Sequence, residues 1–149
     1  MNTAYSPLLP LSSKNINAAQ QESTASAWTK GNIMNVSWVK CSGGNWCPLE
    51  TLNLDSVGDT AGVYMIWHSG NPGRVVRIGQ GVIKDRLSAH RNDKAILAYN
   101  RLGTLHVTWA AVSWSLRDGV ERHLADTWKP LVGSAFPDVQ PIAVNSPWS

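Results

Sequence analysis

Residues 62–90 read GVYMIWHSGNPGRVVRIGQGVIKDRLSAH, and this stretch decides which fold we expect. Two short apolar runs, Gly62–His68 and Arg74–Gln80, flank a loop that reads SGNPG. Asparagine, proline and glycine supply the backbone angles that a chain reversal needs. The pattern therefore predicts a β-hairpin.

The hydrophobic spacing changes directly after the second run. Ile83 and Leu87 stand four residues apart, and so do Arg86 and His90. Because residues four apart share one face of a helix, residues 82–91 are predicted to be helical. This helix would carry a guanidinium and an imidazole beside its apolar edge. A tyrosine on a strand and an Arg/His pair on the next helix suit a site that handles phosphate.

Further segments complete the prediction of an α+β fold. They are a short strand at Asn35–Lys40, a helical segment at about 93–101, a strand at Leu105–Ser113 and a helix at about 118–130. The strand at 105–113 is apolar on both faces, as a strand in the middle of a covered sheet is. With the hairpin, it gives a three-stranded antiparallel sheet flanked by helices. The Pro-rich residues after 130 are expected to wrap irregularly over the core.

The length of 149 residues suits one domain of ordinary size. We expect residues 1–60 to form an N-terminal extension and residues 61–149 to form the folded domain. Residues 1–27, rich in Ser, Asn, Gln and Ala, are expected to be a mobile tail or a loosely packed arm, so the extension would be partly disordered. No apolar run reaches the length of a membrane span, and the first residues do not read as a secretory signal. The expected location is therefore cytoplasmic, with no membrane partner.

Cys41 and Cys47 are the two cysteines of the chain. A structural zinc site takes four ligands, usually with tighter pair spacing, so zinc is not expected here. The pair could also close a small disulfide loop. With no sign of export, two reduced thiols are the expectation.

Tryptophan is unusually frequent, with eight residues against one phenylalanine. Indole rings fill protein cores, and exposed ones stack on nucleobases. The sequence leaves open which tryptophans, if any, are exposed.

The basic charge of the chain is concentrated in its middle. Residues 1–60 and 102–149 each hold three Lys or Arg and four Asp or Glu, whereas residues 61–101 hold seven basic and two acidic residues. The seven are Arg74, Arg77, Lys84, Arg86, Arg91, Lys94 and Arg101. A concentrated basic patch is typical of a protein that binds a polyanion. The alternative is a solvated helix face.

Several of these residues match one motif in order. Gly62-Val63-Tyr64, then Arg77-Ile78-Gly79, then Arg86 and His90, and later Glu121 resemble the signature of the GIY-YIG nucleases. The resemblance implies a compact GIY-YIG-like α+β domain. It also implies an endonuclease that hydrolyses DNA phosphodiester bonds and depends on a divalent ion, Mg²⁺ or Mn²⁺.

The resemblance implies that Glu121 binds the divalent ion, and Mg²⁺ accepts one carboxylate together with phosphate oxygens and waters. On a helix Glu121 would share a stripe with Leu124 and Trp128, where an unpaired carboxylate is costly and needs a cation or hydrogen bonds. The competing interpretation is a capping box, in which Asp118 caps the helix and Glu121 bonds back to its amide.

The other catalytic candidates follow from the same match. Arg86 would stabilise the charge that develops on the phosphate. His90 would orient water or protonate the leaving oxygen, unless it is only a packing residue. Tyr64 would position the phosphate or activate water, which requires a lowered pKa or a metal-bound hydroxide because an ordinary phenol is a poor base.

Two positions depart from the family pattern. Arg77 stands where the family has its second tyrosine, and it either holds the phosphate by charge or weakens the site. The asparagine that follows the glutamate helix in the family has no match directly after Pro130, so Asn145 is the candidate for that role. The candidates for nucleic-acid contacts are Arg74, Arg77, Lys84 and Arg91.

The sequence therefore supports two functions of different class. The first is a divalent-metal-dependent endonuclease acting on DNA. The alternative is a non-catalytic nucleic-acid-binding module that keeps the fold and the basic patch.

Overall fold

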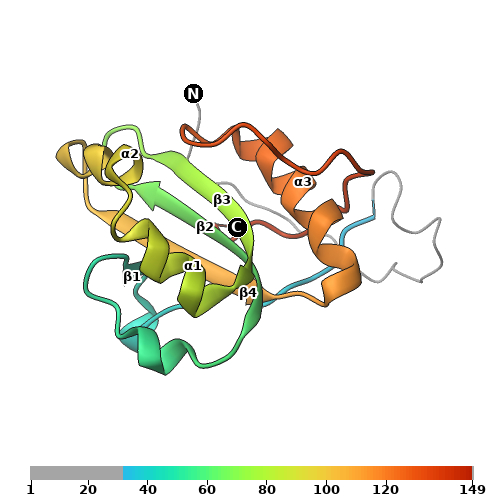
Figure 1. The fold of residues 1–149 in the computed structure, drawn as a ribbon, viewed down its shortest axis with the longest axis horizontal. Coiled ribbons are helices and arrows are strands. Elements are labelled where there is room, and N and C mark those ends of the chain that lie inside the picture. Colours follow the sequence, from blue (N-terminus) through green and yellow to red (C-terminus); the bar gives the residue numbers. More distant parts are fainter. Residues whose placement is uncertain (1–31, 149) are drawn as a thin grey trace.

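The computed structural model describes residues 32–148, so the predicted tail at 1–27 lies outside the described residues. Figure 1 shows an α+β arrangement. The strands are β1 (Cys47–Pro48), β2 (Ala61–His68), β3 (Arg74–Val82) and β4 (Leu105–Ala111), and the helices are α1 (Ile83–His90), α2 (Lys94–Leu97) and α3 (Arg117–Trp128). Short 3₁₀ turns are η3 (Ser42–Gly44), η4 (Leu54–Val57), η5 (Ala98–Arg101) and η6 (Trp114–Leu116). No helix between residues 32 and 148 is long and apolar enough to cross a membrane.

The sheet has four antiparallel strands in the order β1-β4-β2-β3, so the prediction of three strands was wrong. The additional strand is β1, in which Cys47 pairs with Val107 and Pro48 with His106. A strand of two residues that includes proline shows no alternation of apolar and polar residues, so periodicity could not reveal it. Leu49, Leu52 and Val57, which follow β1, are buried in the core.

The predicted strand at Asn35–Lys40 is not a strand in the structure. This segment makes scattered bonds instead: Val39 donates its backbone N–H to Trp109, and Met34 forms an isolated bridge with Val144. Its apolar residues pack beside the sheet. The scattered bonds do not form a continuous ladder, so the segment does not join the sheet.

The predicted hairpin is confirmed. β2 and β3 pair from Ala61↔Val82 to His68↔Arg74, and residues 69–73 form the connecting loop. β4 pairs with β2 on the other side and lies inside the sheet, as its two apolar faces predicted. The predicted helices are also present, and residues 129–148 contain no helix or named strand.

The hairpin runs between α1 and α3 in Figure 1. Tyr64 and Ile66 of β2 pack in one apolar cluster with Leu87 of α1, whereas Val63 packs in a second cluster with Leu124 of α3. Alternation along β2 therefore sends successive side chains to opposite layers. Residues that lie on α1 and α3 can meet only around the edge strand β3.

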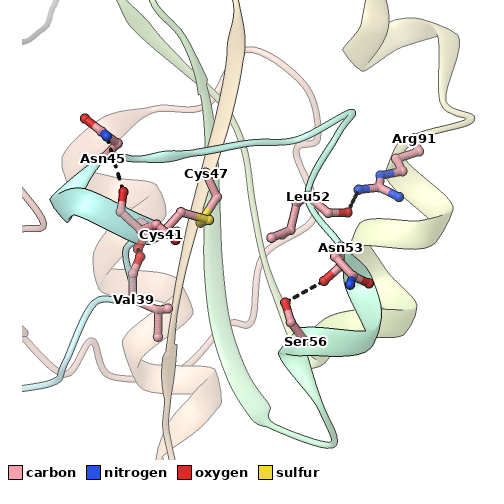
Figure 2. The surroundings of a disulfide bond; sticks show 10 residues. Val39, Cys41, Asn45, Cys47, Leu52, Asn53, Ser56 and Arg91 are labelled. Carbon is pink, nitrogen blue, oxygen red and sulfur yellow. Dashed lines mark hydrogen bonds between the residues drawn. A yellow bond between two sulfur atoms is a disulfide. The ribbon is translucent and has the colours of Figure 1, made fainter.

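Cys41 and Cys47 form a disulfide, which corrects the expectation of reduced thiols. Figure 2 shows the bridge beside the sheet. The turn η3 reverses the chain, with Gly43 and Gly44 at φ values of 72° and 74°, and brings the two Cα atoms to 5.2 Å. Positive φ is readily adopted by glycine, so the two glycines permit the short loop that the bridge closes.

Candidate active site

Tyr64 and His90 meet in the layer between the sheet and α1. Tyr64 lies on β2 and is 1% exposed, and His90 is the last residue of α1 and is 7% exposed. The phenol oxygen of Tyr64 is 2.6 Å from Nε2 of His90, within hydrogen-bond distance. Gly79 is the cross-strand partner of Tyr64, and a Cβ there would overlap the phenol hydroxyl. The glycine of the Arg77-Ile78-Gly79 match therefore makes room for the tyrosine of the Gly62-Val63-Tyr64 match.

Burial keeps both members of this pair neutral. Burial raises the pKa of Tyr64, although a hydrogen bond from Arg77 and the charges of Arg77 and Arg86 act in the opposite direction. Burial, and next the charge of Arg77, lowers the pKa of His90 to about 4. At neutral pH a neutral phenol and a neutral imidazole therefore share one hydrogen bond.

Two arginines border the pair. Arg86 is exposed on α1, and its side chain passes over Gly81, where an added Cβ would lie 3.1 Å from Nε. Arg77 is half-buried on β3 and packs against Gly133, whose φ is +97°. The buried Nε of Arg77 has no hydrogen-bond partner among residues 32–148. Because an unpaired buried N–H of a cation is costly, this atom favours an anionic acceptor beside it.

Glu121 is held by a residue that sequence analysis did not select. The side-chain amide of Gln80 donates to Oε1 of Glu121 at 2.8 Å and to Oδ1 of Asp118 at 2.7 Å. Glu121 is 8% exposed, and burial raises the pKa of its carboxyl group, while the bond from Gln80 lowers it. The signal that could have found Gln80 is its place in the motif region, between Gly79 and Gly81.

The capping-box interpretation of Glu121 is wrong. The residue before α3 is Leu116, its side chain makes no capping bond, and Asp118 lies inside the first turn. The Asp118 carboxylate instead accepts the bond from Gln80. Both acidic side chains therefore point towards β3, where one amide joins them.

The candidate residues are electrostatically linked around β3. The charges of Arg77 and Arg86 lower the pKa of Tyr64, of His90 and of Glu121, and the charge of Glu121 raises the pKa of Tyr64. Tyr64, Arg77, Arg86 and His90 belong to the α1 side of the sheet, and Glu121 reaches β3 from α3. The two arginines are the members of this group that can attract an anionic phosphate, whereas the Glu121 carboxylate repels it unless a cation lies between them.

Asn145 has a different environment. Its side-chain oxygen accepts a bond from the Val36 amide at 2.7 Å, and its side-chain amide donates to the Val36 carbonyl at 3.0 Å. Its own carbonyl accepts from the indole of Trp38. These bonds tie the two ends of the described chain together and occupy the group that the family resemblance would place on a phosphate.

The predicted nucleic-acid contacts are spread over different places. Arg91 donates from Nε to the Leu49 carbonyl at 2.8 Å and also bonds the Leu52 carbonyl, as Figure 2 shows for Leu52, so its guanidinium is used inside the protein. Lys84 forms an exposed ion pair of 3.9 Å with Asp55. Arg74 lies at the far end of the hairpin, opposite His68. Of the four, Arg77 lies within the cluster around Tyr64.

The donor set fits a single hard cation better than a preformed metal cage. Residues 32–148 contain no group of three His, Cys, Asp or Glu side chains placed to hold a metal ion. Glu121 and Asp118 offer carboxylate oxygens, and Mg²⁺ is commonly bound by one or two carboxylates with waters and phosphate oxygens completing its shell. Asp118 and Glu121 are therefore the residues to consider as carboxylate ligands of such an ion.

Comparison of the chain with protein-family models, with curated proteins and with solved structures gave no match. The family resemblance therefore depends on the motif residues and on the contacts among them.

Proposed function

We propose that this protein is a GIY-YIG-like endonuclease that hydrolyses DNA phosphodiester bonds with the help of Mg²⁺ or Mn²⁺. The observation that carries the proposal is the hydrogen bond between Tyr64 and His90 beside Arg77 and Arg86. A proton-accepting pair next to two guanidinium groups meets the two needs of phosphodiester hydrolysis. These are removal of a proton from water and stabilisation of negative charge at phosphorus.

Substrate binding uses the arginines. The exposed guanidinium of Arg86 donates to phosphate oxygens, and the half-buried side chain of Arg77 adds a second positive charge beside it. A guanidinium binds two oxygens at once and gains strength as the oxygens acquire charge in the transition state. Arg77 thus takes the place that the second tyrosine has in the family.

Proton transfer uses the buried pair. Water attacks phosphorus, a new P–O bond forms and the bond to the leaving oxygen breaks. The proton of the water passes to the phenol oxygen of Tyr64, while the phenol proton passes to Nε2 of His90. Burial is the main cause of the lowered pKa of His90, and the charge of a bound phosphate offsets the further lowering by Arg77 and Arg86, so substrate binding makes this imidazole a better base than it is in the free protein.

Glu121 and Asp118 are the residues that would hold the divalent ion, and Gln80 orients them. When bound, the ion supplies positive charge that stabilises the leaving oxygen.

The test is whether the purified protein cleaves plasmid, linear duplex and single-stranded DNA in the presence of Mg²⁺ or Mn²⁺. Reactions with EDTA are the control. Arg86→Ala should lower the rate on the order of a hundredfold or more, because it removes a contact made to the transition state. Arg101→Ala, which removes an exposed arginine on η5, is the matched control and should cleave normally. If the wild-type protein binds DNA but never cleaves it, the non-catalytic binding module replaces this proposal.

A further inference from the structure

Trp114 is the most exposed large hydrophobic residue in the described part of the chain. Its side chain is 79% exposed, whereas Trp109 and Trp67 are 5% and 9% exposed. Leu102, the next most exposed large hydrophobic residue, reaches 46%. A single exposed apolar side chain is ordinary on a protein surface, so the exposure of Trp114 becomes informative only through its surroundings.

The first relevant neighbour is Arg117. Its guanidinium lies 5.7 Å from the centre of the Trp114 ring, in cation–π range. The Nε of Arg117 donates to the Val112 carbonyl at 2.8 Å, so the cation is itself fixed to the end of the sheet. One side of the indole is therefore supported while most of the ring remains exposed to solvent.

The second relevant feature is the position of Trp114 along the chain. η6 leads directly into α3, and Asp118, which Gln80 binds, follows four residues after Trp114. At the rise of 3₁₀ and α-helical backbone these four residues span about 6–8 Å. The exposed indole is therefore carried by the turn that leads into the helix of the two carboxylates.

We propose that Trp114 stacks on an unpaired nucleobase of the substrate. This inference rests on the proposed function in that it takes the ligand to be DNA. A base inside a duplex already stacks on both neighbours and cannot offer a face to an indole, whereas a single-stranded or extrahelical base can. The preferred substrate would then be DNA with an exposed base beside the scissile phosphate, and the positive charge of Arg117 would favour the adjoining backbone.

The experiment measures binding in EDTA, so that cleavage does not interfere. The probes are a labelled single-stranded oligothymidylate, the same length of abasic sugar-phosphate strand, and a duplex of mixed sequence. Trp114→Ala should weaken binding of the oligothymidylate about tenfold, in line with the usual contribution of one base–aromatic stack. Its affinity for the abasic strand should be unchanged. Trp114→Phe should restore most of the loss, and Leu102→Ala, which removes an exposed apolar side chain elsewhere, should have no effect.

The outcomes separate this inference from the proposed function. Equal binding of oligothymidylate by Trp114→Ala and wild type would overturn the stacking role even if the protein cleaves DNA. An equal loss on the abasic strand would also overturn it, because that loss would not involve a base. A change in sedimentation of Trp114→Ala without a change in DNA binding would assign the indole to a protein contact instead. Selective loss on the strand with bases would support the inference even if no cleavage occurs.

Discussion

The phenol oxygen of Tyr64 lies 2.6 Å from Nε2 of His90, although the two residues are 26 positions apart in the chain. β2 supplies the phenol, the last turn of α1 supplies the imidazole, and Gly79 leaves the space that the phenol occupies. Neither side chain is ionised at neutral pH, because burial raises the pKa of Tyr64 and is the main cause that lowers the pKa of His90 to about 4. In the mechanism that we propose, this pair relays a proton when a phosphate is bound.

The relay predicts that the two residues act as one unit. Tyr64→Phe and His90→Ala should each lower the single-turnover cleavage rate by about 10²–10⁴-fold, the usual contribution of general acid–base catalysis. The double variant should be hardly slower than either single variant, because removing one partner already breaks the relay. Rate losses that multiply in the double variant would contradict a shared proton path. Circular dichroism would exclude unfolding as the cause.

The buried imidazole also predicts how stability depends on pH. The pKa of His90 falls from 6.5 to about 4 in the fold, through burial and through Arg77 and Arg86, against the opposing charge of Asp93. The unfolded chain therefore binds the proton first as the pH falls, and stability is lost between about pH 6.5 and 4. The full effect is on the order of 3 kcal/mol. Urea unfolding of wild type and His90→Gln should show a smaller loss over this range for the variant, and parallel curves would contradict the prediction.

Glu121 predicts a conflict between stability and activity. Its buried carboxyl has a raised pKa, so the charged form destabilises the fold as the pH rises above the ordinary value. Glu121→Gln keeps the shape and can still accept from Gln80, yet removes the charge. The melting temperature is measured in EDTA at about pH 7.5, roughly three pH units above the ordinary pKa of a glutamate carboxyl group. Under these conditions the variant should melt at a higher temperature than wild type. It should also cleave on the order of a hundredfold or more slowly with Mg²⁺. A lower melting temperature would mean that the carboxylate stabilises the fold.

Two arginines of the basic segment at residues 61–101 predict different readouts. Arg77 has an unpaired Nε beside the candidate site, whereas Arg91 bonds the carbonyls of Leu49 and Leu52. Arg77→Ala should weaken DNA binding and reduce the salt dependence by about one counterion, with little change in stability. Arg91→Ala should lower stability by about 1–3 kcal/mol, because buried carbonyls lose charged donors, and leave the salt dependence unchanged.

Arg77→Tyr sharpens this comparison, because it restores the residue of the family motif. Retained or faster cleavage by this variant would support the equivalence of the two side chains at this position. A variant that folds but neither binds nor cleaves DNA would show that the charge of Arg77 is required.

The parts of the fold that sequence analysis predicted have strong local signals. The loop residues 69–73 with apolar runs on both sides identified the hairpin, and the spacing of Ile83 and Leu87 identified α1. β1 was missed because its two residues join the sheet through pairing with Val107 and His106, which lie far away in the chain. Such long-range pairing leaves no periodic pattern in the sequence of the shorter strand.

The candidate site was predicted in part for a similar reason. Tyr64, Arg86, His90 and Glu121 stand out by chemical type and spacing. Gln80 acts through its position opposite Val63, which points its amide to α3, and residue type alone does not indicate such a contact. The bonds of Arg91 to carbonyl groups are likewise invisible in the sequence, because any segment offers carbonyls and only the fold decides which ones lie near.

The disulfide gives the last prediction, which separates stability from activity. Cys41 and Cys47 close a loop with a sequence separation of 6, and cross-linking a loop of this size stabilises a fold by about 2 kcal/mol in the chain-entropy model. Reduction should therefore lower the melting temperature by about 4–8 °C. β1, next to the disulfide, and β3, next to the candidate site, are opposite edges of the sheet. Cleavage at about room temperature, where the protein stays folded, should therefore be the same with and without reductant. The double variant Cys41→Ser and Cys47→Ser is the control, since its melting temperature should not respond to reductant. An unchanged wild-type melting temperature on reduction would contradict a stabilising disulfide between these two residues.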